Sequence, residues 1–262
     1  MNRAPLALAV AALSALALAG CAQDLPAAGD TASASATPTL SGSITVDAAA
    51  SLNEVFPALA KEFEAANPGT TITFSFGGSS TLAAQIVSGA PVDVFAAAST
   101  KTMETVQDAD LVGEPTVIAR NELEIAVPKG NPGGITGLQD FADASKTVVV
   151  CDKEVPCGAA AQQVFDLAGL TAKPDSYEPD VTSVLTKVRT DNADAGLVYV
   201  TDVQAAGDEV QGIPFDEADQ AITDYPIATV KGSKNAALAE AWVAYVAAHE
   251  SDLQAAGFLP PQ

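Results

Sequence analysis

The chain has 262 residues, of which 48% are hydrophobic and 17% charged. This composition is typical of a globular protein with one large domain or two lobes, and it argues against a disordered chain. The chain carries 12 Lys and Arg residues against 33 Asp and Glu residues, a formal net charge of −21. Because nucleic acids are bound through clustered Lys and Arg, this balance argues against a nucleic-acid partner. An anionic ligand would have to be held by local groups against the long-range field.

The N-terminus predicts an exported lipoprotein. Arg3 precedes a largely apolar segment at 4–19 that is short for a bilayer span, and the sequence LAGC follows at 18–21. A small-residue cleavage site that ends in Cys resembles the lipobox of bacterial lipoproteins. The resemblance implies that residues 1–20 are a signal peptide and that Cys21 carries lipid, which would anchor the protein outside the cytoplasmic membrane. A plain secretory signal or a transmembrane anchor is the alternative.

Residues 22–41 are rich in Ala, Ser, Thr and Pro without periodicity, which predicts a flexible tether after Cys21. Patterns typical of strands and helices then alternate. The predicted strands are 43–47, 71–76, 92–97, 122–127, 147–151, 196–200 and 224–230. The predicted helices are 51–66, 80–88, 159–168, 182–190 and 235–249. This alternation predicts an α/β fold with largely parallel sheets, and the number of strands suits two lobes.

Two cysteines remain besides Cys21. Cys151 and Cys157 form an even set in an oxidising compartment, so we expect a disulfide between them. The chain-entropy contribution of so small a loop is about 2 kcal/mol, which indicates local stiffening. A metal pair is the alternative, but His249 is the only histidine in the sequence and lies far away in a predicted helix.

Four segments share one design, in which a strand ends, small or polar residues follow and a helix begins. They lie at 48–52, 77–82, 156–159 and 179–182. Helix starts leave N–H groups unpaired and carry a partial positive charge, so they bind anions without cationic side chains. The carboxyl ends of strands in open α/β sheets border the ligand crevice, which predicts an anion site there.

Each candidate also has a structural interpretation. Ser51 and Glu54 fit a helix capping box, and 77–81 fits an ordinary turn with an N-cap. Tyr199 fits a core strand. The order in which the segments occur is more informative than any one of them.

In that order, the segments resemble the molybdate-binding proteins of ABC importers, from residue 43 to about 258. The matching pieces are DAAASL (47–52), GGSSTLAAQI (77–86), GAPVDVFAAA (89–98), VPCG (155–158), DV (180–181), GLVYVTD (196–202) and YPIA (225–228). The resemblance implies that an oxyanion is held by the side chains of Ser51, Ser79 and Tyr199 and by the main-chain amides of Cys157 and Val181. Ser80 is the alternative to Ser79.

Two positions depart from the family pattern. Position 157 is Cys where Ala is better known, which a main-chain contact tolerates. Position 47 is Asp where an apolar residue is common, so we expect the Asp47 carboxylate to point away from the anion or to be paired.

The resemblance implies an α/β, two-lobed, type II periplasmic-binding-protein fold with an interlobe ligand cleft. The lobes would be 42–122 plus 225–262 and 123–224, with a hinge where the chain crosses near 121–124 and 223–225. The expected function is extracytoplasmic capture of molybdate, and of tungstate, for an ABC permease and its ATPase. We expect a monomer without enzymatic activity, without a cofactor and without a directly liganded metal ion.

Molybdate is a fully deprotonated dianion near neutral pH and only accepts hydrogen bonds, whereas phosphate keeps a proton. A site made of donors alone therefore disfavours phosphate, but it accepts sulfate unless the cavity size excludes it. Binding of sulfate or another oxyanion is the first alternative. A secreted enzyme is the second, although the sequence offers no G-x-S-x-G motif and no convincing base for a serine nucleophile. An adhesive lipoprotein without a small ligand is the third.

Overall fold

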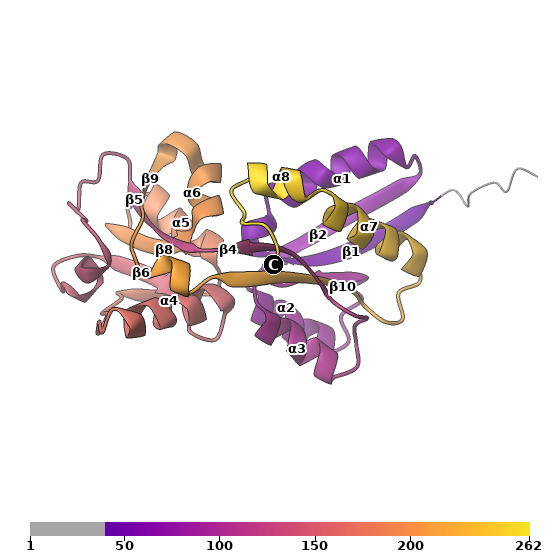
Figure 1. The fold of residues 1–262 in the computed structure, drawn as a ribbon, viewed down its shortest axis with the longest axis horizontal. Helices are drawn as coiled ribbons and strands as arrows, with labels where there is room; N and C mark the ends of the chain where they lie inside the picture. Colours follow the sequence, from indigo (N-terminus) through magenta and orange to yellow (C-terminus); the bar gives the residue numbers. More distant parts are fainter. Residues whose placement is uncertain (1–39) are drawn as a thin grey trace, which may run out of the picture. The chain divides into compact units, whose positions relative to one another are not determined.

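The structure is a computed structural model, and it describes residues 40–262 (Figure 1). The expected signal peptide at 1–20, the lipidation site at Cys21 and nearly all of the expected tether lie outside the described residues. Among residues 40–262, no helix has both the length and the apolar character of a membrane span.

Two five-stranded sheets form the framework of this part of the chain. The first has the strand order β2-β1-β3-β10-β4, and the second has the order β7-β6-β8-β5-β9. The strands of the first sheet are β1 (Gly42–Ala49), β2 (Thr70–Gly77), β3 (Val94–Ala96), β4 (Thr116–Asn121) and β10 (Thr223–Thr229). The strands of the second sheet are β5 (Leu123–Pro128), β6 (Val148–Cys151), β7 (Ser176–Glu178), β8 (Ala195–Tyr199) and β9 (Val210–Ile213).

Helices cover both faces of the first sheet (Figure 1). Along β3, Val94 and Ala96 join the apolar cluster beneath α1, α7 and α8, and Phe95 joins the cluster beneath α2 and α3, as the alternation of a strand requires. Trp242 of α7 lies at the centre of the first cluster, edge-on to Phe56 of α1. These helices are α1 (Val55–Ala66), α2 (Ser79–Val87), α3 (Thr100–Asp108), α7 (Ala236–Ala248) and α8 (Glu250–Ala255).

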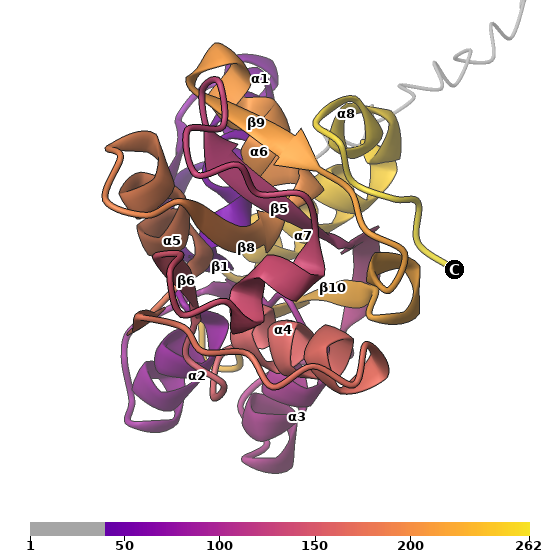
Figure 2. The same ribbon diagram turned by 90° about the vertical axis from the view of Figure 1, so that its left-hand side faces the viewer.

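Three helices pack on the second sheet, with α4 on one face and α5 and α6 on the other (Figures 1 and 2). The packing of α5 on β8 depends on Gly196, because a Cβ atom there would lie 2.6 Å from Cγ1 of Val184. These helices are α4 (Pro156–Leu167), α5 (Val181–Arg189) and α6 (Val200–Ala206). Short 3-10 turns complete the described chain: η1 (Ala50–Leu52), η2 (Leu138–Ala142), η3 (Gly207–Glu209) and η4 (Ala218–Gln220).

The chain passes between the two sheets twice. Strand β4 ends in the first sheet at Asn121, and β5 begins in the second sheet at Leu123. The chain returns before β10, whose first residue, Thr223, pairs with Asn121. Both β5 and β10 run antiparallel to their two neighbours, whereas the other four strands of each sheet share one direction. The expectation of largely parallel sheets therefore holds except at these two strands. Neighbouring strands become parallel when a crossover helix connects them, and a strand that arrives from another sheet has no such connection to its neighbours.

The predicted elements are present with shifted ends, and several short elements escaped prediction. The helix expected over 51–66 starts only at Val55, because residues 50–52 form η1. Helix α3 buries only three of its residues, too few for a clear periodic pattern. The other elements that were not predicted are β4, β7, β9, α6 and α8.

Candidate functional site

A small cavity lies where elements of the two sheets meet. Its volume is about 10 Å³, the space that about one water molecule needs, so it excludes ligands of drug size, which occupy several hundred Å³. Its lining residues are Ala49, Ala50, Ser51, Gly77, Gly78, Ser79, Ala98, Pro156, Cys157, Asp180, Val181 and Tyr199.

Three helices begin at this cavity, α2 at Ser79, α4 at Pro156 and α5 at Val181. The first N–H groups of an α-helix lack partners within the helix, and they carry the positive end of its dipole. Neither Gly78 before α2 nor Val155 before α4 provides a side-chain cap. The partial positive charges of α2 and α4 are therefore not offset by a capping side chain, whereas Asp180 caps α5, and the starts of α2 and α4 favour an anion in the small space that they share.

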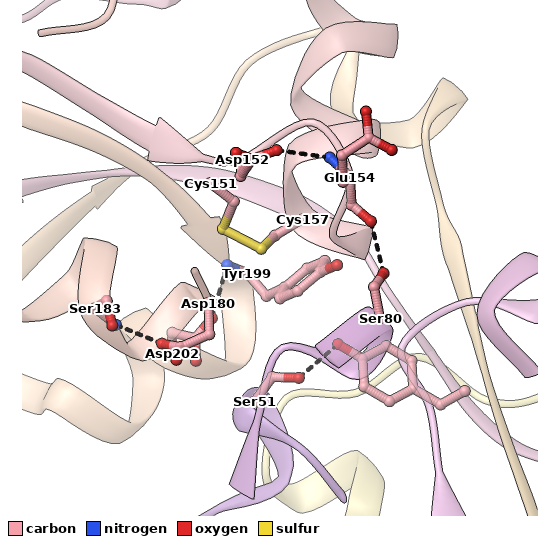
Figure 3. The surroundings of a disulfide bond; sticks show 11 residues. Ser51, Ser80, Cys151, Asp152, Glu154, Cys157, Asp180, Ser183, Tyr199 and Asp202 are labelled. Carbon is pink, nitrogen blue, oxygen red and sulfur yellow. Dashed lines mark hydrogen bonds between the residues drawn. A yellow bond between two sulfur atoms is a disulfide. The ribbon is translucent and has the colours of Figure 1, made fainter. Parts of the chain in front are cut away.

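The structure brings the expected site residues together. Ser51, Ser79, Cys157, Val181 and Tyr199 all line the cavity. Ser80 is outside the lining, and its Oγ donates a hydrogen bond of 2.6 Å to the carbonyl of Glu154 (Figure 3). Of the two candidate serines, the geometry therefore favours Ser79.

Ser79 is positioned as a hydrogen-bond donor. Its side chain is 1% exposed, and its Oγ accepts a hydrogen bond of 3.1 Å from the main-chain N–H of Ala98. No residue in 40–262 accepts a hydrogen bond from its hydroxyl. The proton of Ser79 is therefore available to a ligand in the cavity.

Ser51 does not cap a helix. The N-cap of α1 is Glu54, which makes no side-chain cap, so the capping-box interpretation is wrong. The Ser51 hydroxyl instead forms a hydrogen bond of 2.7 Å with the hydroxyl of Tyr225. Asn121 directs its Nδ2 toward the same Tyr225 oxygen at 3.4 Å and donates to Oγ1 of Thr201 at 2.9 Å.

Tyr225 and Asn121 are functional candidates that the sequence analysis missed. Tyr225 begins the quoted piece YPIA, but its sequence context gives no sign that it faces Ser51, which is 174 positions away. Asn121 is an uncharged residue at a strand end. Only the pairing of β10 with β4 brings them together.

Tyr199 has a buried hydroxyl without a hydrogen-bond partner in the described part of the chain. It is near the hydroxyls of Thr223 and Tyr225 but forms no hydrogen bond with either. Burial raises the pKa of Tyr199 well above its ordinary value, so the phenol keeps its proton. The ring lies between the disulfide and Ser51 in Figure 3. Because Tyr199 also lines the cavity, a ligand there would supply the acceptor that this hydroxyl lacks.

The disulfide joins Cys151 at the end of β6 to Cys157 in the first turn of α4, with an S–S distance of 2.07 Å (Figure 3). It closes the turn that brings the main chain of Cys157 to the cavity. The next residue must be glycine, because a Cβ atom on Gly158 would lie 1.9 Å from the carbonyl oxygen of Asp152.

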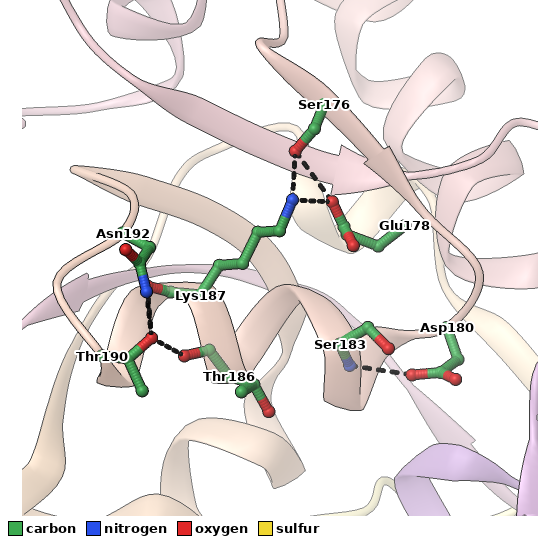
Figure 4. Close-up of polar contacts among 8 residues, drawn as sticks. All are labelled: Ser176, Glu178, Asp180, Ser183, Thr186, Lys187, Thr190 and Asn192. Carbon is green, nitrogen blue, oxygen red and sulfur yellow. Dashed lines mark hydrogen bonds and ion pairs between the residues drawn. The ribbon is translucent and has the colours of Figure 1, made fainter.

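Helix α5 is held in place by polar contacts at both ends (Figure 4). At its start, Asp180 accepts a hydrogen bond of 2.8 Å from the N–H of Ser183. Near its end, Nζ of Lys187 lies 2.5 Å from Oε1 of Glu178 and donates to Oγ of Ser176 at 2.9 Å. The contact of Asp180 caps the helix start that borders the cavity, and the contacts of Lys187 tie the last turn of the helix to the edge strand β7.

Asp180 is the only lining residue with a carboxylate, and its Oδ1 is turned to its own helix. Neither Lys nor Arg occurs in the lining.

Asp47 is also outside the lining and pairs across the strands with Ser75. Burial raises the pKa of Asp47 to about 6, and a hydrogen bond from Ser75 partly opposes this rise. Within residues 40–262, no group of three or more His, Cys, Asp or Glu side chains is placed to hold a metal ion.

This architecture, with two α/β lobes and a cavity between them, is that of a periplasmic binding protein. The periplasmic molybdate-binding protein of Azotobacter vinelandii superimposes with a TM-score of 0.73 at 22% identity, over 84% of this chain and 100% of that one. The sulfate-binding protein SubI of Mycobacterium tuberculosis has a TM-score of 0.71 at 17% identity, over 83% of this chain and 86% of that one. At these identities the likeness establishes the fold alone.

The chain belongs to the family of bacterial extracellular solute-binding proteins, whose model matches residues 44–258. It is 41% identical over 256 residues to the molybdate-binding protein ModA of Mycobacterium tuberculosis, and the match covers 96% of both proteins.

Proposed function

We propose that the protein captures molybdate outside the cytoplasmic membrane and delivers it to an ABC permease. The observation that carries this proposal is the unpartnered, buried hydroxyl of Tyr199, which lines a cavity where three helices begin. The relationship to a protein named for molybdate binding supports the choice of ligand.

In the proposed complex, the side chains of Ser51, Ser79 and Tyr199 and the main-chain N–H groups of Cys157 and Val181 donate hydrogen bonds to the oxyanion. Molybdate only accepts hydrogen bonds near neutral pH, so it matches these donors. Hydrogen phosphate carries a proton that needs an acceptor, and a site of donors would leave that proton unpaired. Tungstate has the same charge and shape as molybdate, so we expect it to bind as well.

The ligand would hold the two lobes together. We propose that the lobes comprise 42–122 plus 225–262 and 123–224, with the hinge at the two chain crossings. Two hydrogen bonds between residues of the two lobes support a closed arrangement. Asn53 donates to Oγ1 of Thr182 at 3.4 Å, and Ser80 donates to the carbonyl of Glu154 at 2.6 Å. Binding then favours closure, because only the closed state presents every donor.

Export and anchoring follow from the N-terminal sequence. We propose that residues 1–20 are removed as a signal peptide and that lipid on Cys21 holds the protein at the outer face of the membrane. The protein would act as a monomer that binds and releases its ligand without changing it. Transport and ATP hydrolysis would belong to the permease and its ATPase.

A thermal-shift titration of the purified protein with molybdate, tungstate, sulfate and phosphate tests the proposal. Ligand at one hundred times its Kd stabilises the folded state by about 2.7 kcal/mol, which shifts the Tm by roughly 5–11 °C for a protein of this size. We expect this shift with molybdate and tungstate at concentrations where sulfate and phosphate have no effect. An equal response to sulfate would change the proposed ligand, and no response to any oxyanion would overturn the proposed site.

A further inference from the structure

We propose that Asn121 and Tyr225 are positioning residues that fix the direction of the hydrogen bond at Ser51, so that Ser51 presents its proton to the bound oxyanion. This inference rests on the proposed function, because it concerns how the same site distinguishes oxyanions.

The direction is set first at Asn121, which is fully buried. Its Oδ1 accepts a hydrogen bond of 3.0 Å from the main-chain N–H of Glu122. A main-chain N–H can only donate, so this contact identifies the oxygen side of the amide. The nitrogen side then donates to Oγ1 of Thr201 at 2.9 Å and points at Oη of Tyr225 at 3.4 Å.

Tyr225 transmits this direction. Its hydroxyl is buried and has two hydrogen-bonding neighbours in the described chain, Nδ2 of Asn121 and Oγ of Ser51. An amide nitrogen cannot accept a proton, and the nearby Tyr199 hydroxyl forms no hydrogen bond, so among residues 40–262 the proton of Tyr225 goes to Ser51. The opposite direction would leave the Tyr225 proton buried without an acceptor, which is unfavourable. Burial also raises the pKa of Tyr225 well above its ordinary value, so that its proton is retained.

Ser51 therefore accepts from Tyr225 and keeps its own proton free. No other described residue accepts a hydrogen bond from its hydroxyl, and Ser51 lines the cavity. Ser79 reaches the same condition by another route, because its Oγ accepts from the N–H of Ala98. Both serine hydroxyls thus face the ligand as donors. This arrangement suits an anion without a proton better than one that still carries a proton.

The hydrogen bonds that lead from Asn121 through Tyr225 to Ser51 lie where the chain crosses between the two sheets. Asn121 lies at one crossing between the sheets, and Tyr225 lies two residues into β10, just after the other crossing. The orientation of the Ser51 proton is therefore set by the two segments that connect the lobes, and it is established before the ligand enters.

The test is calorimetric titration of wild-type protein and variants with molybdate and with inorganic phosphate at pH 7. We expect Tyr225→Phe to weaken molybdate binding about tenfold, while phosphate binding is unchanged or stronger. In a Ser51→Ala background, Tyr225→Phe should change molybdate affinity less than about twofold, because Tyr225 acts through Ser51. Tyr245→Phe, which removes a hydroxyl from α7 far from the cavity, is the matched control and should bind as the wild type does.

Asn121→Ala is a second variant. It keeps the Tyr225 hydroxyl but removes the amide donor, so the Tyr225 hydroxyl can either donate to Ser51 or accept from it. It should reduce the ratio of molybdate to phosphate affinity in the same sense as Tyr225→Phe, by a smaller factor. The inference is overturned if Tyr225→Phe and Ser51→Ala weaken molybdate binding independently, or if molybdate and phosphate affinities fall by the same factor. A wild-type protein that binds neither molybdate nor any other oxyanion would instead contradict the proposed function itself.

Discussion

Gly78 and Pro179 approach each other so closely that a Cβ atom on Gly78 would lie 2.4 Å from the Pro179 carbonyl oxygen. Gly78 precedes α2, beside the first sheet, and Pro179 lies just before α5, beside the second. Gly78 and Asp180, the residue after Pro179, both line the cavity. The absence of a side chain at position 78 therefore determines how closely the starts of α2 and α5 can approach a shared ligand.

The first prediction concerns this contact. Gly78→Ala should weaken molybdate binding at least tenfold in a calorimetric titration, because the two helix starts can no longer close on the anion. Gly137→Ala is the control, since Gly137 lies outside the cavity lining and its Cβ atom would meet nothing within 4 Å. Equal affinities for the two variants would contradict the interpretation.

The second prediction separates stability from binding at Tyr199. Tyr199→Phe removes a buried hydroxyl that has no partner, so the free energy of unfolding without ligand should stay the same or rise by about 1 kcal/mol. Molybdate affinity should fall about 10- to 100-fold, because hydrogen bonds to charged groups contribute about 1.5–3 kcal/mol. Urea unfolding and titration measure the two effects. A loss of stability with unchanged affinity would assign Tyr199 to the core.

The third prediction distinguishes the adjacent serines. Ser79→Ala should reduce molybdate affinity about 10- to 100-fold, because Ser79 lines the cavity with a free proton. Ser80→Ala removes only the hydrogen bond to Glu154 and should cost less than about tenfold. Parallel titrations compare the two variants, and a larger effect at Ser80 would reverse the assignment.

The fourth prediction concerns Asp202, which is buried and accepts a hydrogen bond from the N–H of Tyr199 at 2.9 Å. Burial raises its pKa from 3.8 to about 7, and the nearby charge of Asp180 adds to the rise. Because the folded pKa lies above the unfolded one, the stability contribution is complete below about pH 4 and is lost as the pH rises through 7.

The free energy of unfolding of Asp202→Asn, minus that of the wild type, should therefore be about 2–4 kcal/mol larger at pH 8 than at pH 4. The amide oxygen can still accept the hydrogen bond from Tyr199. Urea unfolding of both proteins across this pH range is the measurement, with the exposed Asp208→Asn as the control. A difference that does not change with pH would contradict the prediction.

The fifth prediction concerns the disulfide. Replacing Cys151 and Cys157 by Ser should lower the free energy of unfolding by about 2 kcal/mol, the value for closing a small loop. Molybdate affinity should change less than about tenfold, because the proposed contact at position 157 is a main-chain N–H. Reduction of the wild type should have the same effect on Tm as the double substitution. Complete loss of binding would mean that the disulfide is needed to place α4.

Much of the architecture follows from local patterns in the sequence. Runs such as TITFSF and GLVYV predict strands, and TITFSF lies within β2, while GLVYV covers the last four residues of β8 and the first residue of α6. The small and polar residues after the strands predict helix starts without large side chains, and the starts at Ser79, Pro156 and Val181 border the cavity. These features are local because main-chain conformation and helix capping depend on neighbouring residues.

The tertiary structure decided the rest. Strand direction in β5 and β10 depends on how the chain crosses between sheets, which no single segment encodes. The hydrogen-bond partner of Ser51 could not be predicted from the sequence either, because the residues around Ser51 fit a helix cap equally well. A hydroxyl can donate and accept, and its role depends on which group the fold brings within 3 Å or so. In this protein that group is Tyr225, brought close to Ser51 because β1, which ends just before Ser51, and β10, which carries Tyr225, both pair with β3.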